Sequence, residues 1–210
     1  MFWNTLKNII LLNRWFYFPY TVLLMAGIAV QLTCTQFEIS LFINGFHTTT
    51  FDFIFNYLTN LGDGMFAVAV VIAIYLFRKP HTIQSILCFV VPALLTQFLK
   101  RLVFAGHYRP SVRMKAFTEL HYVPGVNMHE FNSFPSGHTT SAFAIFLFLS
   151  LISTNKRLGL AFLAVSLLIG LSRIYLLQHF YEDVLAGSLI GVTGTTLIYT
   201  IFETRRATQK

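Results

Sequence analysis

The stretch FNSFPSGHTTSAFAIFLFLSLISTN, residues 131–155, decides the class of fold. It contains no Lys, Arg, Asp or Glu, and the basic pair Lys156-Arg157 follows it directly. A helix needs roughly 20 apolar residues to cross the hydrocarbon core of a bilayer. We therefore interpret residues 131–155 as one membrane span.

The composition of the whole chain agrees with this interpretation. Of its 210 residues, 55% are hydrophobic and 11% are charged, whereas soluble domains carry about 25% charged residues. This excludes an ordinary soluble protein, and the 16% aromatic content excludes a disordered chain. The net charge of +7 is spread between apolar stretches instead of forming a dense basic run, so we expect no nucleic-acid partner.

Five further uncharged stretches predict an all-α, polytopic membrane protein with six transmembrane helices in one bundle, a single domain over residues 1–210. Two stretches are short, so the charges at their ends, Asp63 and Arg173, are expected at a helix mouth or in a polar cavity. Thr48-Thr49-Thr50 before Phe51-Asp52-Phe53 predicts a short capped helix that lies in the membrane interface as an anchor. The five stretches are residues 15–37, 64–77, 80–99, 158–172 and 184–202.

The distribution of Lys and Arg predicts how the spans are oriented. Nine basic residues fall on the side of both termini, which the positive-inside rule makes cytoplasmic. Six fall on the opposite side, and five of these lie in the long loop between the third and fourth spans. Such a cluster needs an anionic ligand, and phosphate is the leading candidate. The cytoplasmic set is Lys7, Arg14, Arg78, Lys79, Lys156, Arg157, Arg205, Arg206 and Lys210, and the outer set is Lys100, Arg101, Arg109, Arg113, Lys115 and Arg173.

The first candidate site for chemistry is Pro135-Ser136-Gly137-His138, at the entrance of the fourth span. Pro135 suits a first helical position, and a helix N-terminus presents free N–H groups to an anion. Gly137 lets the backbone approach an oxyanion, the Ser136 hydroxyl can donate a hydrogen bond, and His138 can transfer a proton. Taken alone, the same residues also fit an ordinary turn.

The second candidate site is Ser172-Arg173 with His179 and Asp183. Positions i and i+4 share a helix face, so Asp183 can hold one imidazole nitrogen of His179 and leave the other free as a nucleophile. Arg173 lies off that face in a continuous helix, so we expect a break near residues 178–182. The alternative is a structural pair at a helix end with Arg173 as an interface residue.

Lys100-Arg101 and Arg109-Pro110 supply a third set, because Arg presents a planar fork to phosphate oxygens and Lys a movable charge. The predicted topology places all three sets on one membrane face. Together they resemble the three-part signature of the type 2 phosphatidic acid phosphatase superfamily. The first part departs from the family pattern, in which Lys lies seven residues before the Arg of Arg-Pro. Position 102 is Leu here, so Lys100, nine residues before Arg109, or Arg101 takes that role.

The resemblance implies hydrolysis of a phosphomonoester or pyrophosphate of a membrane lipid through a phosphohistidine, with no metal and no cofactor. His179 would attack phosphorus, Asp183 would orient it, and His138 would protonate the departing oxygen and then help to activate water. Cations fixed in this way can do what Mg²⁺ does elsewhere. Because the two histidines need opposite protonation states, we predict a bell-shaped pH profile. The phosphate-holding groups would be Lys100, Arg109, Ser136, Gly137 and Arg173.

The expected substrates are phosphatidic acid, phosphatidylglycerol phosphate, an isoprenyl diphosphate or a lipid A type glycolipid. The additional cations Arg101, Arg113 and Lys115, with His107, His121 and His129, hint at a large or multiply phosphorylated headgroup. Alternatives are a lipid phosphotransferase with the same intermediate, a metal hydrolase using the histidines, or a transporter with Arg173, His179 and Asp183 in an ion path.

The expected location is a bacterial inner (cell) membrane. The termini would be cytoplasmic, the first span an uncleaved signal anchor, and the active site on the periplasmic or extracellular face. The oligomeric state is left open.

Overall fold

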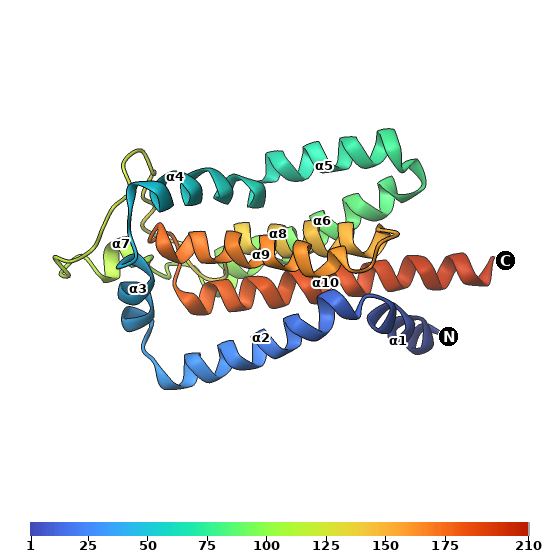
Figure 1. Cartoon of the computed structure of the whole chain (residues 1–210), viewed down its shortest axis with the longest axis horizontal. Helices are drawn as coiled ribbons and strands as arrows, with labels where there is room; N and C mark the ends of the chain where they lie inside the picture. Colours follow the sequence, from blue (N-terminus) through green and yellow to red (C-terminus); the bar gives the residue numbers. More distant parts are fainter. Residues whose placement is uncertain (210) are drawn as a thin grey trace.

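The uncharged stretches are helical in the computed structural model, which describes residues 1–209 (Figure 1). The described residues contain no strand, and the all-α prediction is confirmed. Lys210, counted above among the cytoplasmic cations, lies outside the described residues. The helices are α1 Phe2–Leu12, α2 Arg14–Thr33, α3 Gln36–Asn44, α4 Thr49–Leu58, η1 Thr59–Gly62, α5 Gly64–Phe77, η2 Lys79–His81, α6 Thr82–Phe98, η3 Leu99–Val103, α7 Pro110–Arg113, α8 Gly137–Ile152, α9 Leu158–Tyr175 and α10 Tyr181–Thr208.

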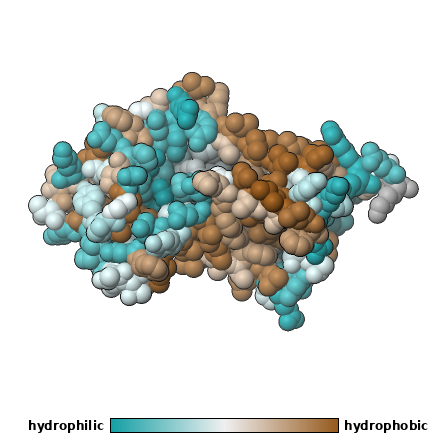
Figure 2. Space-filling view, turned by 90° about the horizontal axis from the view of Figure 1, so that it is seen from above, coloured by the Kyte–Doolittle hydropathy of each residue, from teal (hydrophilic) through white to brown (hydrophobic). Residues whose placement is uncertain are grey.

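The long helices run side by side, and hydrophobic side chains form a broad zone between hydrophilic ends (Figures 1 and 2). Within residues 1–209, four helical segments are long and apolar enough to cross a membrane: α2, the continuous segment Lys79–Val103, α9 and α10. A fifth, formed by α4 with α5, is bent, and α8 is apolar but shorter. Helices thus occupy all six predicted places, while the count of six spans stays a prediction.

The second predicted span is broken. The segment Thr49–Gly62 and α5 meet at an angle of 58°, and Asp63 caps α5 by accepting a hydrogen bond from the Met65 amide. Thr48 caps α4 as predicted. However, α4 follows the bundle and packs against α9, and it is α3 that lies across the end of the bundle (Figure 1). The short capped helix is present as α4, separated from α5 by η1 and the bend, and its place in the membrane interface stays a prediction.

The N-terminal region differs from its prediction in two ways. Residues before the first span form the helix α1, which the sequence reading missed. The predicted span over residues 15–37 ends at Thr33, because Thr35 and Glu38 form a capping box that starts α3. The reason is local: the side chain of Thr35 accepts from the Glu38 amide, and the carboxylate of Glu38 accepts from the Thr35 amide.

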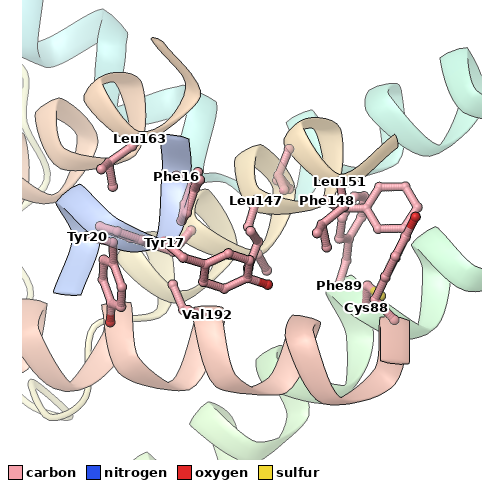
Figure 3. Packing of buried hydrophobic residues seen from close by; sticks show 14 of the residues in the cluster. Phe16, Tyr17, Tyr20, Cys88, Phe89, Leu147, Phe148, Leu151, Leu163 and Val192 are labelled. Atoms are coloured by element: carbon pink, nitrogen blue, oxygen red, sulfur yellow. The ribbon is translucent and has the colours of Figure 1, made fainter. Parts of the chain in front are cut away.

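The main hydrophobic core lies where α2, α6, α8, α9 and α10 meet (Figure 3). Its largest buried members are aromatic rings, and they pack edge to face or tilted against each other. This packing fixes the helices that carry the candidate site at their ends. The labelled side chains are Phe16, Tyr17 and Tyr20 on α2, Cys88 and Phe89 on α6, Leu147, Phe148 and Leu151 on α8, Leu163 on α9 and Val192 on α10.

Two glycines, four residues apart, let α8 and α10 approach closely. A Cβ atom on Gly187 would lie 2.6 Å from the carbonyl oxygen of Ser136, and one on Gly191 would lie 2.5 Å from that of Thr140. Real side chains do not come so near, so any other residue would push the helices apart. Small residues at this spacing are typical of close helix pairs in membranes. Their effect here is to bring the start of α8 beside the start of α10.

Candidate active site

Two of the predicted motifs meet at the starts of α8 and α10. Ser136 is the N-cap of α8, and its hydroxyl oxygen accepts hydrogen bonds from the Thr139 hydroxyl at 2.9 Å and, more weakly, from the Thr139 amide. Its own amide donates to the carbonyl oxygen of Asp183 at 3.0 Å. The helix begins at Gly137, so Pro135 precedes the cap and does not occupy the first helical position as predicted. The helix starts two residues later than predicted because Ser136 supplies the capping oxygen.

His179 and Asp183 form the predicted pair in a different local structure. His179 lies in the connection between α9 and α10, and Asp183 lies in the first turn of α10. Nδ1 of His179 is 3.2 Å from Oδ2 of Asp183. A carboxylate only accepts, so we assign the proton to Nδ1, which leaves the Nε2 lone pair free. The predicted break between Arg173 and His179 is confirmed, because α9 ends at Tyr175.

Burial sets the protonation state of the nucleophile candidate. His179 is 2% exposed. Burial, followed by the nearby charges of Arg109, Lys100 and Arg173, holds the pKa of His179 well below its usual range. A neutral imidazole is the form that can attack an electrophile, so the environment favours the nucleophilic state.

Three cations surround this imidazole. Lys100, Arg109 and Arg173 are 8%, 9% and 6% exposed, and none of them forms an ion pair within the described residues. Nε and Nη1 of Arg109 donate to the carbonyl oxygens of Phe131 and Gln178. Three buried charges that outnumber the carboxylates near them and form no direct ion pair are costly, so the site is built to receive an anion.

Arg173 leaves a donor available for that anion. Its Nη1 donates to the hydroxyl oxygen of Thr59 at 2.6 Å, whereas its buried Nε has no partner within the described chain. Buried donors are normally satisfied, and an exception calls for an explanation such as a ligand. Nη1 of Arg173 is thus fixed by Thr59, and Nε is left as a donor without a partner.

These groups line one cavity of 560 Å³. The structure brings six of the eight predicted site residues to its wall, and the other two, Ser136 and Asp183, stand behind it as supports. The catalytic and binding roles assigned above remain predictions. The six predicted residues in the wall are Lys100, Arg109, Gly137, His138, Arg173 and His179.

The helix that carries Lys100 widens from α to π geometry over Leu99–Val103. Lys100 therefore turns into the cavity, Arg101 is exposed outside it, and Leu102 is 71% exposed. The π turn rotates the side chains, which lets Lys100 occupy the site despite its unusual spacing from Arg109.

The additional basic residues are not part of the cavity, with one exception. The Arg113 guanidinium lies over the rings of Phe37 and Phe180, and His121 pairs with Asp52 at 2.8 Å. Their engagement within the chain explains why they are not free for a ligand. Of the six residues taken as a hint of a large or multiply phosphorylated headgroup, only His129 lines the cavity, so the cavity wall does not support that argument and the headgroup stays a prediction.

The sequence motifs did not predict two buried hydroxyl residues of the site, Ser133 and Thr59. Ser133 donates to Oδ2 of Asp183 at 2.5 Å, and Thr59 accepts from Arg173. Ser133 lies two residues before Pro135, and this position next to the motif could have marked it as a residue of the site. Nothing in the sequence marks Thr59, which lies more than one hundred positions from Arg173 and meets it only through the fold.

The model of the PAP2 superfamily matches residues 82–207. The lipid A 4'-phosphatase of Bacteroides thetaiotaomicron is 27% identical over 173 residues, which cover 78% of this chain and 75% of the relative. The crystal structure of Aquifex aeolicus LpxE superposes with a TM-score of 0.68 at 27% identity, over 78% of this chain and 93% of that one. A transmembrane PAP2-type phosphatidylglycerolphosphate phosphatase from Bacillus subtilis, 24% identical, shares the fold with a TM-score of 0.65 over 89% and 94% of the two chains.

Proposed function

We propose that this chain, which belongs to the PAP2 superfamily and is an integral membrane lipid phosphatase, works through a covalent phosphohistidine without a metal ion. The observation that carries the proposal is the free Nε2 of His179 beside three buried cations that form no ion pair within the described residues. We further propose that residues 1–210 act as one domain.

The first step forms a bond from Nε2 of His179 to phosphorus while the bond from phosphorus to the lipid oxygen breaks. His138 donates its proton to that departing oxygen. The oxyanion charge of the pentacoordinate state is balanced by Lys100, Arg109 and Arg173, and phosphoryl transfer depends mainly on such positioning and charge stabilisation. The Gly137 amide completes the set of donors to the phosphate, and Ser136, behind the cavity wall, caps the helix that presents this amide.

The second step hydrolyses the intermediate. Water gives a proton to His138 and attacks phosphorus, the bond from phosphorus to Nε2 breaks, and inorganic phosphate leaves. Asp183 keeps the proton of His179 on Nδ1 in both steps, so Nε2 is returned as a free base. Atoms and charges balance without any further reactant.

The substrate is a membrane lipid phosphate, drawn from phosphatidic acid, phosphatidylglycerol phosphate, an isoprenyl diphosphate and lipid A type glycolipids. The name of the Bacteroides relative supports the last of these. We place the protein in a bacterial inner membrane, with cytoplasmic termini and the cavity on the periplasmic or extracellular face. The distribution of Lys and Arg supports this orientation.

The test is phosphate release by the purified protein in detergent, with excess chelator, for the wild type and His179→Ala. We expect chelator-resistant release that the substitution lowers by on the order of 10³-fold or more, and a radiolabelled phosphoenzyme that only the wild type forms. His107→Ala is the matched control, because His107 is an exposed histidine of the outer loop outside the cavity. Equal release by wild type and His179→Ala would remove His179 as the nucleophile.

A further inference from the structure

The cavity extends beyond the residues that the proposed reaction uses. Its wall also contains Asn56, Asp63, Asn127 and His129, which we call the cavity mouth. Asn56 comes from α4 and Asp63 from the break before α5, while Asn127 and His129 come from the outer loop. We infer that the cavity mouth binds an uncharged, hydroxyl-bearing headgroup, a sugar or glycerol, attached to the phosphate that His179 attacks.

The loop part of the cavity mouth is fixed through its backbone. The carbonyl oxygen of Asn127 accepts from Nε2 of Gln178 at 3.1 Å, and that of His129 accepts from the Ser111 hydroxyl at 2.9 Å. The amide of Arg109 donates to the carbonyl oxygen of Glu130 at 2.8 Å. Three backbone anchors thus hold residues 127–130 beside the catalytic histidine.

The side chains of the cavity mouth are left free by this arrangement. Those of Asn56, Asn127 and His129 make no hydrogen bond to other residues of the described chain, and Asp63 accepts only a long one of 3.4 Å from Met65. An amide offers both donors and acceptors, and a carboxylate offers acceptors. This mixture matches hydroxyl groups, which donate and accept.

The charges of the cavity mouth disfavour the alternative headgroups. A second phosphate needs cations, but the cavity mouth has no Lys or Arg and it carries the carboxylate of Asp63. Arg101, Arg113 and Lys115 lie outside the cavity. A hydrocarbon chain next to the phosphate would leave the amides of Asn56 and Asn127 unpaired, which is unfavourable on desolvation. An isoprenyl diphosphate therefore fits this cavity less well than a sugar or glycerol phosphate.

The inference rests on the proposed function, and the experiment separates the two. We compare kcat/KM for a glycolipid monophosphate, phosphatidylglycerol phosphate, phosphatidic acid and an isoprenyl diphosphate in mixed micelles with chelator. We call the glycolipid monophosphate and phosphatidylglycerol phosphate the headgroup-bearing substrates. For the better of these two we expect a kcat/KM about tenfold or more above that for the isoprenyl diphosphate, the effect of two or more added hydrogen bonds. The first two substrates distinguish a sugar from glycerol.

Substitutions test which residues of the cavity mouth bind the headgroup. The double substitution Asn56→Ala with Asn127→Ala should lower kcat/KM for the preferred headgroup-bearing substrate about tenfold and for phosphatidic acid, which has no free hydroxyl beyond its phosphate, by less than about twofold. The matched control is Asn60→Ala, because Asn60 is exposed in η1 and does not line the cavity. Asn60→Ala should leave the ratio of kcat/KM between the headgroup-bearing substrate and phosphatidic acid unchanged.

Binding provides the second measurement. His179→Ala protein should bind the preferred headgroup-bearing lipid more tightly than the isoprenyl diphosphate, even where no phosphate is released. Preference for the isoprenyl diphosphate in both assays, or an equal loss on all substrates in the double variant, would overturn the headgroup inference while the phosphatase function stands. Absence of chelator-resistant release by the wild type would overturn the proposed function instead, and the binding preference would then decide the headgroup inference alone.

Discussion

Three donors converge on one carboxylate oxygen just behind the cavity wall. Oδ2 of Asp183 accepts from Nδ1 of His179, from the amide of Phe180 at 2.9 Å and from the hydroxyl of Ser133. The carboxylate cannot rotate without losing all three hydrogen bonds. Its position therefore fixes the imidazole of His179, because the ring must follow the oxygen that holds its proton.

At this scale the protonation state of His179 is testable. Because burial and the charges of Arg109 and Lys100 lower its pKa, the imidazole should still be neutral at about pH 6, below the usual histidine value of about 6.5. We would record histidine-selective ¹⁵N spectra in detergent and assign the His179 signal by its loss in His179→Gln. A protonated His179 signal at that pH would contradict the electrostatic argument.

A second residue prediction concerns how Arg173 is held. Thr59→Val keeps the shape but removes the acceptor for Nη1, so a buried charged donor is left unsatisfied. We expect kcat/KM to fall about tenfold or more, and inhibition by vanadate, which imitates the pentacoordinate state, to weaken more than inhibition by phosphate.

The control for Arg173 is Thr59→Ser, which retains the hydroxyl and should restore most of the activity. A merely structural role for Thr59 would be revealed by equal weakening of both inhibitors, accompanied by a lower unfolding temperature in Thr59→Val. In that case Thr59 would support the fold and not the orientation of the guanidinium.

At the scale of elements, the π turn at the end of α6 decides which basic residue reaches the cavity. Leu99–Val103 has π geometry, and it points Lys100 inward and Leu102 outward. Restoring the family spacing by placing a lysine at position 102 should therefore fail, since that side chain faces away from the site. The usual spacing rule is overridden by a local change in helical repeat.

The corresponding measurement uses Lys100→Ala alone and combined with Leu102→Lys. We expect Lys100→Ala to lower kcat/KM by on the order of a hundredfold, the loss of one charged contact to phosphate. The double variant should be no more active than the single one, and Arg101→Ala should stay within about threefold of the wild type. Rescue by Leu102→Lys would show that the helix turns differently in the membrane.

At the scale of the whole molecule, the cavity and both termini lie at opposite ends of the bundle (Figure 1). Cys34 is exposed at the end of α2 near α3, and Cys88 is buried. In spheroplasts, a membrane-impermeant maleimide should label Cys34 from outside, because the proposed orientation places this end outside the membrane.

The matched control combines Cys34→Ser with Thr208→Cys, since Thr208 is exposed near the C-terminus at the other end. That variant should be labelled only after the membrane has been made permeable. The reverse pattern, with Thr208→Cys labelled in intact spheroplasts and Cys34 protected, would invert the orientation inferred from the Lys and Arg residues.

What the sequence determined by itself was the helical class, the places of the main helices and six of the residues that line the cavity. These follow from local chemistry: uncharged stretches long enough for a bilayer, and reactive side chains at the ends of those stretches. Even the contact of His179 with Asp183 depends on a separation of only four residues.

Only the tertiary structure decided the remaining features. The hydrogen bond from Arg173 to Thr59 and the close approach of α8 to α10 at Gly187 depend on contacts between distant segments. The π turn that selects Lys100 is a local change of helical geometry that residue spacing did not predict. Sequence spacing describes neighbours along one helix, whereas these contacts are set by how helices pack. The physical reason is that burying the aromatic core fixes the helix positions first, and the polar groups at the helix ends then find partners that no local pattern encodes.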